Sequence, residues 1–149
     1  MIRKISDIEK IIIHCSDSDF GDVNLINSWH KARGWKGCGY HFIITNGVAT
    51  QGKPYNLKLD GLIQRGRLIN EVGAHCRGYN ETSVGVCLIG RRHFTGKQLY
   101  SSLPRLLFAL VKIFDLKSEN IHGHNEFSGK TCPNIRLGPL REMVGARFK

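Results

Sequence analysis

Histidine and cysteine side chains that could bind a metal ion lie at two places far apart in the chain. His14 ends an apolar run of three isoleucines, and Cys132 follows His122 and His124 in the segment HGHNEFSGKTCP. Imidazole nitrogens and a thiolate sulfur are usual ligands of tetrahedral zinc, and three protein ligands leave a fourth position open for water or substrate. His14, Cys132 and one of the two later histidines would therefore form a zinc site of the catalytic kind.

Each of these residues also has a purely structural interpretation. A histidine at a strand end is more often a hydrogen-bonded structural residue, and a single cysteine often fills a core position. His122 and His124 stand two residues apart, so a strand would turn both to the same face, and the spacing does not choose between them. The metal site is favoured because ligand-type side chains occur together in two distant segments.

The composition predicts one globular domain with a basic surface. The chain has 149 residues, 41% hydrophobic and 23% charged, so we expect a single domain over 1–149. Lys and Arg outnumber Asp and Glu by 22 to 12, a formal net charge of +10. This charge favours a polyanionic partner, either nucleic acid or the bacterial envelope, while a solvated basic surface without a partner is the plainer alternative.

The N-terminal segment has no signal-peptide pattern, because acidic residues interrupt the stretch that would have to be apolar. No stretch has the length and apolarity of a transmembrane helix. We therefore expect synthesis in the cytoplasm. An odd number of cysteines, five, without a secretory context predicts free thiols. Those expected to be small buried residues are Cys15, Cys38, Cys76 and Cys87.

Strand-like and helix-like segments alternate, which predicts an α/β domain with a mixed central sheet of about five strands flanked by helices. Asn46-Gly47 is a typical two-residue hairpin turn, and we place the second strand of that hairpin at 48–50. The segment 54–68 shows no regular pattern. The other expected strands are 9–14, 40–45, 83–90 and 121–124.

Helical spacing of apolar residues predicts helices over 22–33 and 99–116 and a last helix from Gly138. Asp22 is placed to cap the first, and Thr95 and Gln98 have the spacing of a capping box before the second. In the last helix we expect three residues to face inward, Leu140, Met143 and Val144, and three outward, Arg141, Arg147 and Lys149.

Six motifs in a fixed order resemble one family over nearly the whole chain. They are IIIHCS, RGWxxxGYHFII, GAHxxGYN, SVGVCLIG, FTxxQ and HNEFSGKTCP. The chain is similar to the zinc-dependent N-acetylmuramoyl-L-alanine amidases of type 2, which include phage endolysins and share a fold with peptidoglycan recognition proteins. This resemblance implies hydrolysis of the amide between N-acetylmuramic acid and L-alanine in peptidoglycan, as in cell-wall lysis by a phage or prophage endolysin.

The resemblance also implies roles for individual residues. His14, His124 and Cys132 would bind Zn²⁺, and His124 is selected because the family's ligand precedes the cysteine by eight residues. Tyr40 and Lys130 match the family's catalytic tyrosine and lysine. Lys130 would stabilise the developing oxyanion, and Tyr40 would orient the attacking water or share in proton transfer.

Three more residues are candidates for substrate binding: His41, His75 and Arg67. Each has a structural alternative, since His41 could pack at a strand start, His75 could line the groove without reacting, and Arg67 could be a solvated arginine. The resemblance further implies a peptidoglycan substrate, with contact to the anionic envelope, no specific nucleic acid and a monomeric enzyme. The protein would reach periplasmic peptidoglycan after the inner membrane is permeabilised.

Two other functions compete with this one. A peptidoglycan recognition module that only binds is disfavoured, because such family members typically lack the cysteine that Cys132 matches. A basic nucleic-acid-binding protein is supported by charge alone, since no helix-turn-helix, RNA-binding aromatic motif or zinc-finger spacing is present.

Overall fold

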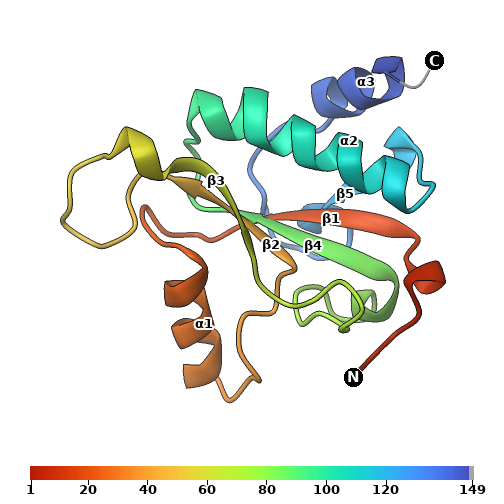
Figure 1. The fold of residues 1–149 in the computed structure, drawn as a ribbon, viewed down its shortest axis with the longest axis horizontal. Helices are drawn as coiled ribbons and strands as arrows, with labels where there is room; N and C mark the ends of the chain where they lie inside the picture. The colour runs from red at the N-terminus through yellow and green to blue at the C-terminus, as the bar shows by residue number, and fades with distance from the viewer. Residues whose placement is uncertain (148–149) are drawn as a thin grey trace.

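A five-stranded sheet with the order β3-β2-β4-β1-β5 forms the centre of the computed structural model, which describes residues 1–147 (Figure 1). β1 (Lys10–Cys15) pairs in parallel with β4 (Ser83–Leu88) and with β5 (Ile121–Gly123). β2 (Phe42–Asn46) is parallel to β4, and β3 (Asp60–Arg65) is antiparallel to β2 at the sheet edge. The predicted mixed α/β sheet is confirmed.

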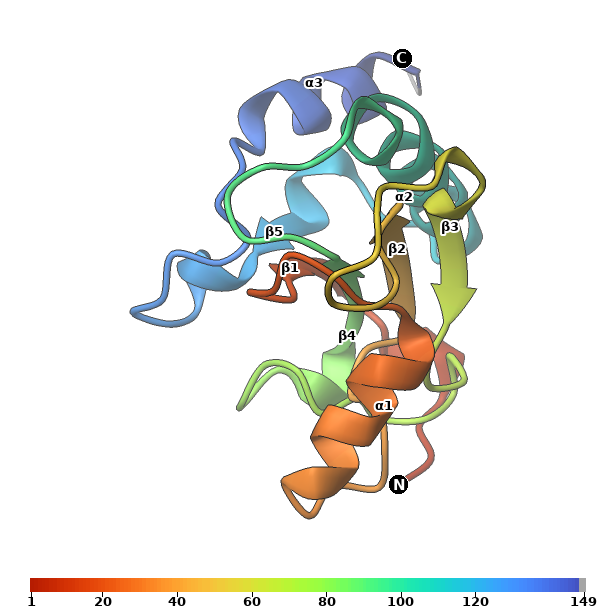
Figure 2. The same ribbon diagram turned by 90° about the vertical axis from the view of Figure 1, so that its left-hand side faces the viewer.

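Helices cover both faces of this sheet. α2 (Leu103–Ile113) and α3 (Gly138–Arg147) lie on one face, and α1 (Val23–Ala32) lies on the other (Figures 1 and 2). The central strands β1 and β4 are therefore buried on both sides, which is why their sequences are nearly continuous apolar runs rather than alternating ones. None of the helices within residues 1–147 is long and apolar enough to cross a membrane.

Side-chain caps define where the helices begin. The Asp22 carboxylate accepts a hydrogen bond of 2.8 Å from the Leu25 amide at the start of α1. Thr95 and Gln98 form the predicted capping box, with reciprocal side-chain to backbone bonds of 2.9 and 3.1 Å. The helix expected over 99–116 differs in detail, because a π-helical turn (Gln98–Ser102) precedes α2.

The hairpin partner at 48–50 was predicted wrongly. The strand that pairs with β2 is β3, and it lies in the segment for which no pattern was found. Asn46 lies opposite Asp60, and the Gly47 amide donates to the Leu59 carbonyl over 3.1 Å, so the chain leaves the turn and returns twelve residues later. β3 is an edge strand with Leu62 and Ile63 both exposed, so it needs no alternation of apolar and polar residues.

The inward face of α3 was predicted only in part. Leu140 and Val144, one turn apart, are buried, whereas Met143 is 41% exposed at the side of the helix. Arg141 does not face solvent freely, because its side chain donates to the Ile121 carbonyl (2.8 Å) and to Glu126. Arg147 lies over the Phe108 ring at 4.6 Å. Lys149 lies outside the described residues.

All five cysteines are free thiols. Four of them are buried as predicted, namely Cys15, Cys38, Cys76 and Cys87, and Cys132 is partly exposed.

Two of the buried histidines, His30 and His41, have lowered pKa values, which predicts that acid destabilises the fold. Burial, more than the nearby arginine charges, lowers the pKa of His30 to about 4, and burial also lowers the pKa of His41 to about 4. Their ordinary pKa is 6.5. Each ring accepts a backbone hydrogen bond at Nδ1, from the Gly39 amide in His30 and from the Gly85 amide in His41. Protonation would break both bonds.

We expect the free energy of unfolding to fall as the pH is lowered from about 6.5 towards about 4. The unfolded chain takes up protons on His30 and His41 before the folded chain does, so their stabilisation is complete above pH 6.5 and is lost below it. Urea unfolding of the chelator-treated, metal-free protein at several pH values measures this dependence. The variant His30→Asn keeps an acceptor for the Gly39 amide but does not titrate, so its pH dependence should be shallower; an unchanged dependence would contradict the assignment.

Candidate metal centre

Two neighbouring parallel strands of the sheet end at the same edge and carry the two histidines there. His14 is the last residue but one of β1, and His124 follows directly after β5, at the start of a short 3-10 turn. Carboxyl ends of parallel strands are where α/β sheets place their sites, because the loops that follow converge there. The ring centroids of His14 and His124 are 4.5 Å apart.

Cys132 is brought to these histidines by backbone hydrogen bonds. The Asn125 amide donates to the Cys132 carbonyl over 2.7 Å, which holds the two ends of the loop after β5 together. The Cys15 amide, at the end of β1, donates to the Cys132 sulfur over 3.1 Å. As a result, one potential ligand atom from each of His14, His124 and Cys132 lies within 4.8 Å of the others.

The protonation states fit a metal site. Burial, with added repulsion from His124 and Lys130, keeps the pKa of His14 well below its ordinary value. Burial and the Lys130 charge also lower the pKa of His124. Both imidazoles are therefore neutral near pH 7 and keep a lone pair for a cation. The Cys15 thiol and burial raise the pKa of Cys132, so a bound cation must displace the thiol proton.

The donor set indicates which metal the site could hold. Two imidazoles and one thiol match the ligands that zinc prefers, and no carboxylate is among them. Within residues 1–147 this is the one group of three or more histidine, cysteine or acidic side chains gathered closely enough to hold a metal ion. His122, in contrast, lies 3.3 Å from the Glu126 carboxylate and outside the group.

A large open cavity of about 800 Å³ adjoins the three residues. Tyr40 and Lys130, which the resemblance matched to catalytic roles, both line it. The Tyr40 ring lies 5.1 Å from the His14 ring, and burial raises the pKa of its hydroxyl well above the ordinary value, so the hydroxyl stays protonated. Lys130 is exposed, and its charge acts on both histidines of the group.

Several residues of the cavity wall were not singled out as site residues from the sequence. His30, on α1, is one of them. Trp35 lies beside it, with the Arg33 guanidinium 5.6 Å from the Trp35 ring. Arg33 and Arg77 give this wall positive charge, but no spacing in the sequence distinguishes them from other surface arginines.

The three candidates for substrate binding lie in different places. His75 lines the cavity but sits behind His14, with its Nδ1 atom 2.8 Å from Nε2 of His14. His41 is fully buried and outside the cavity, where its Nε2 atom contacts the Arg3 guanidinium (3.1 Å) and the Glu71 carbonyl (2.8 Å). The His41 side chain is fully buried among these partners and lies apart from the cavity that His14 and Lys130 line.

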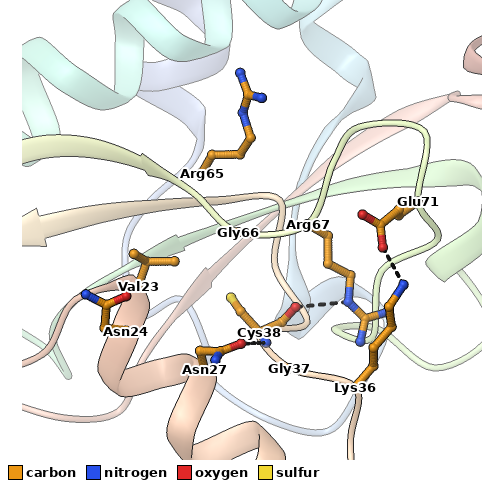
Figure 3. Close-up of a pocket in the computed structure, with 10 residues that line it drawn as sticks. All are labelled: Val23, Asn24, Asn27, Lys36, Gly37, Cys38, Arg65, Gly66, Arg67 and Glu71. Atoms are coloured by element: carbon orange, nitrogen blue, oxygen red, sulfur yellow. Dashed lines mark hydrogen bonds and ion pairs between the residues drawn. The ribbon is translucent and has the colours of Figure 1, made fainter.

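Arg67 lies in a second, smaller cavity of about 310 Å³, which the metal group does not line (Figure 3). Its guanidinium donates to the carbonyls of Cys38 (2.9 Å) and Val72 (2.7 Å), so it ties two loops together. Beside it, Lys36 and Glu71 form an ion pair of 2.7 Å, while Arg65 points away from both (Figure 3). Arg67 thus makes structural contacts and lies outside the cavity that the metal group lines.

Comparisons with known proteins find one family over most of the chain. The family model described as N-acetylmuramoyl-L-alanine amidase matches residues 4–135. The endolysin of Klebsiella phage KP32 is 34% identical over 143 residues, covering 90% of this chain and 85% of that protein. The endolysin of Escherichia phage T7 is 35% identical over 140 residues, covering 87% and 82%.

Solved structures are similar over a comparable length. The endolysin N-acetylmuramoyl-L-alanine amidase LysCS from Clostridium intestinale URNW superimposes with a TM-score of 0.75 at 26% identity, covering 99% of this chain and 88% of that one. Peptidoglycan recognition protein LB of Drosophila has a TM-score of 0.67 at 27% identity, covering 87% and 76%.

Proposed function

Since the chain belongs to the N-acetylmuramoyl-L-alanine amidase family and is therefore a peptidoglycan amidase, we propose that His14, His124 and Cys132 hold a zinc ion that serves its hydrolytic chemistry. The observation that carries this proposal is that two neutral imidazoles and one thiol lie close together in the wall of an open cavity. Three protein ligands leave a position free, as catalytic zinc sites do.

The bound ion would lower the pKa of a water molecule and polarise the amide carbonyl of the substrate. In our proposal the Lys130 ammonium, which lines the same cavity, stabilises the negative charge that develops on that carbonyl oxygen. The protonated Tyr40 hydroxyl holds the attacking water as a hydrogen-bond partner. Arg33 and Arg77 would attract the carboxylates of the stem peptide.

The proposal extends to where and how the protein acts. We place its synthesis in the host cytoplasm and its action on periplasmic peptidoglycan, reached once the inner membrane is permeabilised. The net charge of +10 would raise the encounter rate with the anionic envelope. All proposed ligands come from one chain, so we expect a monomer to be active, which sedimentation of the active enzyme would test.

The decisive experiment measures release of stem peptides from purified peptidoglycan by mass spectrometry. We expect cleavage between the lactyl group and L-alanine, its loss with a chelator, and its return when zinc is restored. The variant His124→Ala serves as a control for contaminating hydrolases. Chelator-resistant cleavage by the folded protein would contradict the zinc proposal, and the absence of any cleavage by the zinc-loaded protein would contradict amidase action on this substrate.

The paired variants His122→Ala and His124→Ala test which histidine is the ligand. His124→Ala should abolish zinc retention and hydrolysis, because it removes one of three ligands. His122→Ala removes only a contact with Glu126, so we expect it to retain most zinc and activity. Zinc content after dialysis and the rate of peptide release are measured together. The reverse pattern would assign the ligand to His122.

A further inference from the structure

A buried hydrogen-bond chain runs from the proposed ligand His14 to the backbone carbonyl of Tyr79, just before β4. Nε2 of His14 lies 2.8 Å from Nδ1 of His75, and Nε2 of His75 lies 3.3 Å from the Ser83 hydroxyl. The Ser83 hydroxyl lies 2.7 Å from the Tyr79 carbonyl oxygen. All three side chains, of His14, His75 and Ser83, are buried.

The order of donors and acceptors along this hydrogen-bond chain follows from its last group, the Tyr79 carbonyl. A carbonyl oxygen only accepts, so the single Ser83 proton is donated to Tyr79, and the Ser83 oxygen must then accept from Nε2–H of His75. A neutral imidazole has one N–H, so Nδ1 of His75 carries a lone pair and accepts from Nε2–H of His14. The donor and the acceptor of each hydrogen bond are thereby determined, from the Tyr79 carbonyl back to His14.

This hydrogen-bond chain determines which nitrogen of His14 can bind a metal ion. An imidazole nitrogen has a single in-plane position for a proton or a lone pair, and Nε2 of His14 uses it towards His75. The lone pair is then left on Nδ1. If the chain ran in the opposite direction, Nδ1 of His14 would carry the proton and could not bind a cation.

We propose that His75 and Ser83 are positioning residues that hold His14 as the Nε2–H tautomer and so keep its Nδ1 atom free for the metal ion. This inference rests on the metal site proposed above and adds to it a role for two residues that act through His14. Partners of this kind typically raise metal affinity by about 10-fold to 100-fold, because they fix the tautomer and the orientation of the ligand ring.

The His75 ring is held in a slot that leaves it little freedom. A Cβ atom on Gly85 would lie 2.7 Å from the ring, and one on Gly73 would lie 2.6 Å from it, so both positions need glycine for the ring to fit. The Asn80 side chain accepts from the backbone amides of His75 (2.8 Å) and Cys76 (2.9 Å). The ring meets that of His14 edge to face, with an interplanar angle of 87°.

The tautomer is measured directly in the zinc-free protein. Long-range ¹H–¹⁵N correlation spectra of ¹⁵N-histidine-labelled protein near pH 7.5 distinguish a protonated Nε2 from a protonated Nδ1. We expect the Nε2–H form for both His14 and His75. A protonated Nδ1 on His14 would overturn the inference. Because no metal is present, this result is independent of whether the protein binds zinc or hydrolyses peptidoglycan.

Variants then connect the tautomer to metal affinity, measured by competition with a chromophoric chelator. His75→Ala should weaken zinc binding by about 10-fold to 100-fold. His75→Asn places an amide oxygen where it can accept from His14 and should recover most of that loss. Ser83→Ala keeps His75 but removes its acceptor, so the His14 spectrum should show a mixture of tautomers. Unchanged affinity in His75→Ala together with an unchanged tautomer in Ser83→Ala would overturn the proposal.

Discussion

Replacing Cys132 with serine is expected to lower zinc affinity by more than about 100-fold and to reduce peptide release to the background rate. A serine hydroxyl keeps its proton at neutral pH, whereas a cysteine thiol loses its proton when a metal binds. The substitution also removes the sulfur that accepts the Cys15 amide, so the loop after β5 loses a hydrogen bond to the end of β1. Zinc content by mass spectrometry and the rate of peptide release measure both effects.

Cys76→Ser is the matched control for this variant. Cys76 lines the same cavity and is buried, but its thiol is not part of the group of three. We expect this variant to keep zinc and most activity, with at most a modest loss of stability. Full hydrolysis by Cys132→Ser would show that the ligand set is wrong, and equal losses in both variants would show that the effect comes from disturbed packing.

The central strands and the helix caps could be predicted because their signals are local. An isoleucine run predicted β1, and the spacing of Thr95 and Gln98 predicted a capping box whose two hydrogen bonds are present. β3 could not be found this way. An edge strand needs only one partner, and the loop between Gly47 and β3 is held by long-range bonds such as that from the Asn56 amide to the Gly47 carbonyl.

The candidate site was predictable in chemical type but not in arrangement. Ligand-type residues stood out at His14 and Cys132, yet spacing alone left His122 and His124 equivalent. They separate in the structure because β5 ends at Gly123, so His124 belongs to the following turn and no longer to the strand. The place of His75 behind His14 depends on contacts across 61 residues, which no local pattern encodes.

Lys130→Ala is expected to lower kcat by about 100-fold to 1,000-fold while zinc stays bound. This is the usual cost of losing one group that stabilises an oxyanion, and it corresponds to about 3 to 4 kcal/mol of transition-state stabilisation. Zinc affinity should not fall, because the Lys130 charge lowers the pKa of His14 and His124 by repulsion and its removal takes a positive charge away from the cation site. Single-turnover peptide release, with zinc content measured on the same samples, separates the two quantities.

Lys112→Ala serves as the control, since it removes an equal charge from an exposed position on α2, away from the cavity. Any loss that comes only from weaker attraction to the anionic substrate should appear in both variants and should shrink as salt is added. A loss specific to Lys130→Ala that persists at high salt assigns the lysine to the chemical step. If Lys130→Ala instead loses zinc, the lysine acts by holding the loop that carries Cys132, and the role in oxyanion stabilisation is refuted.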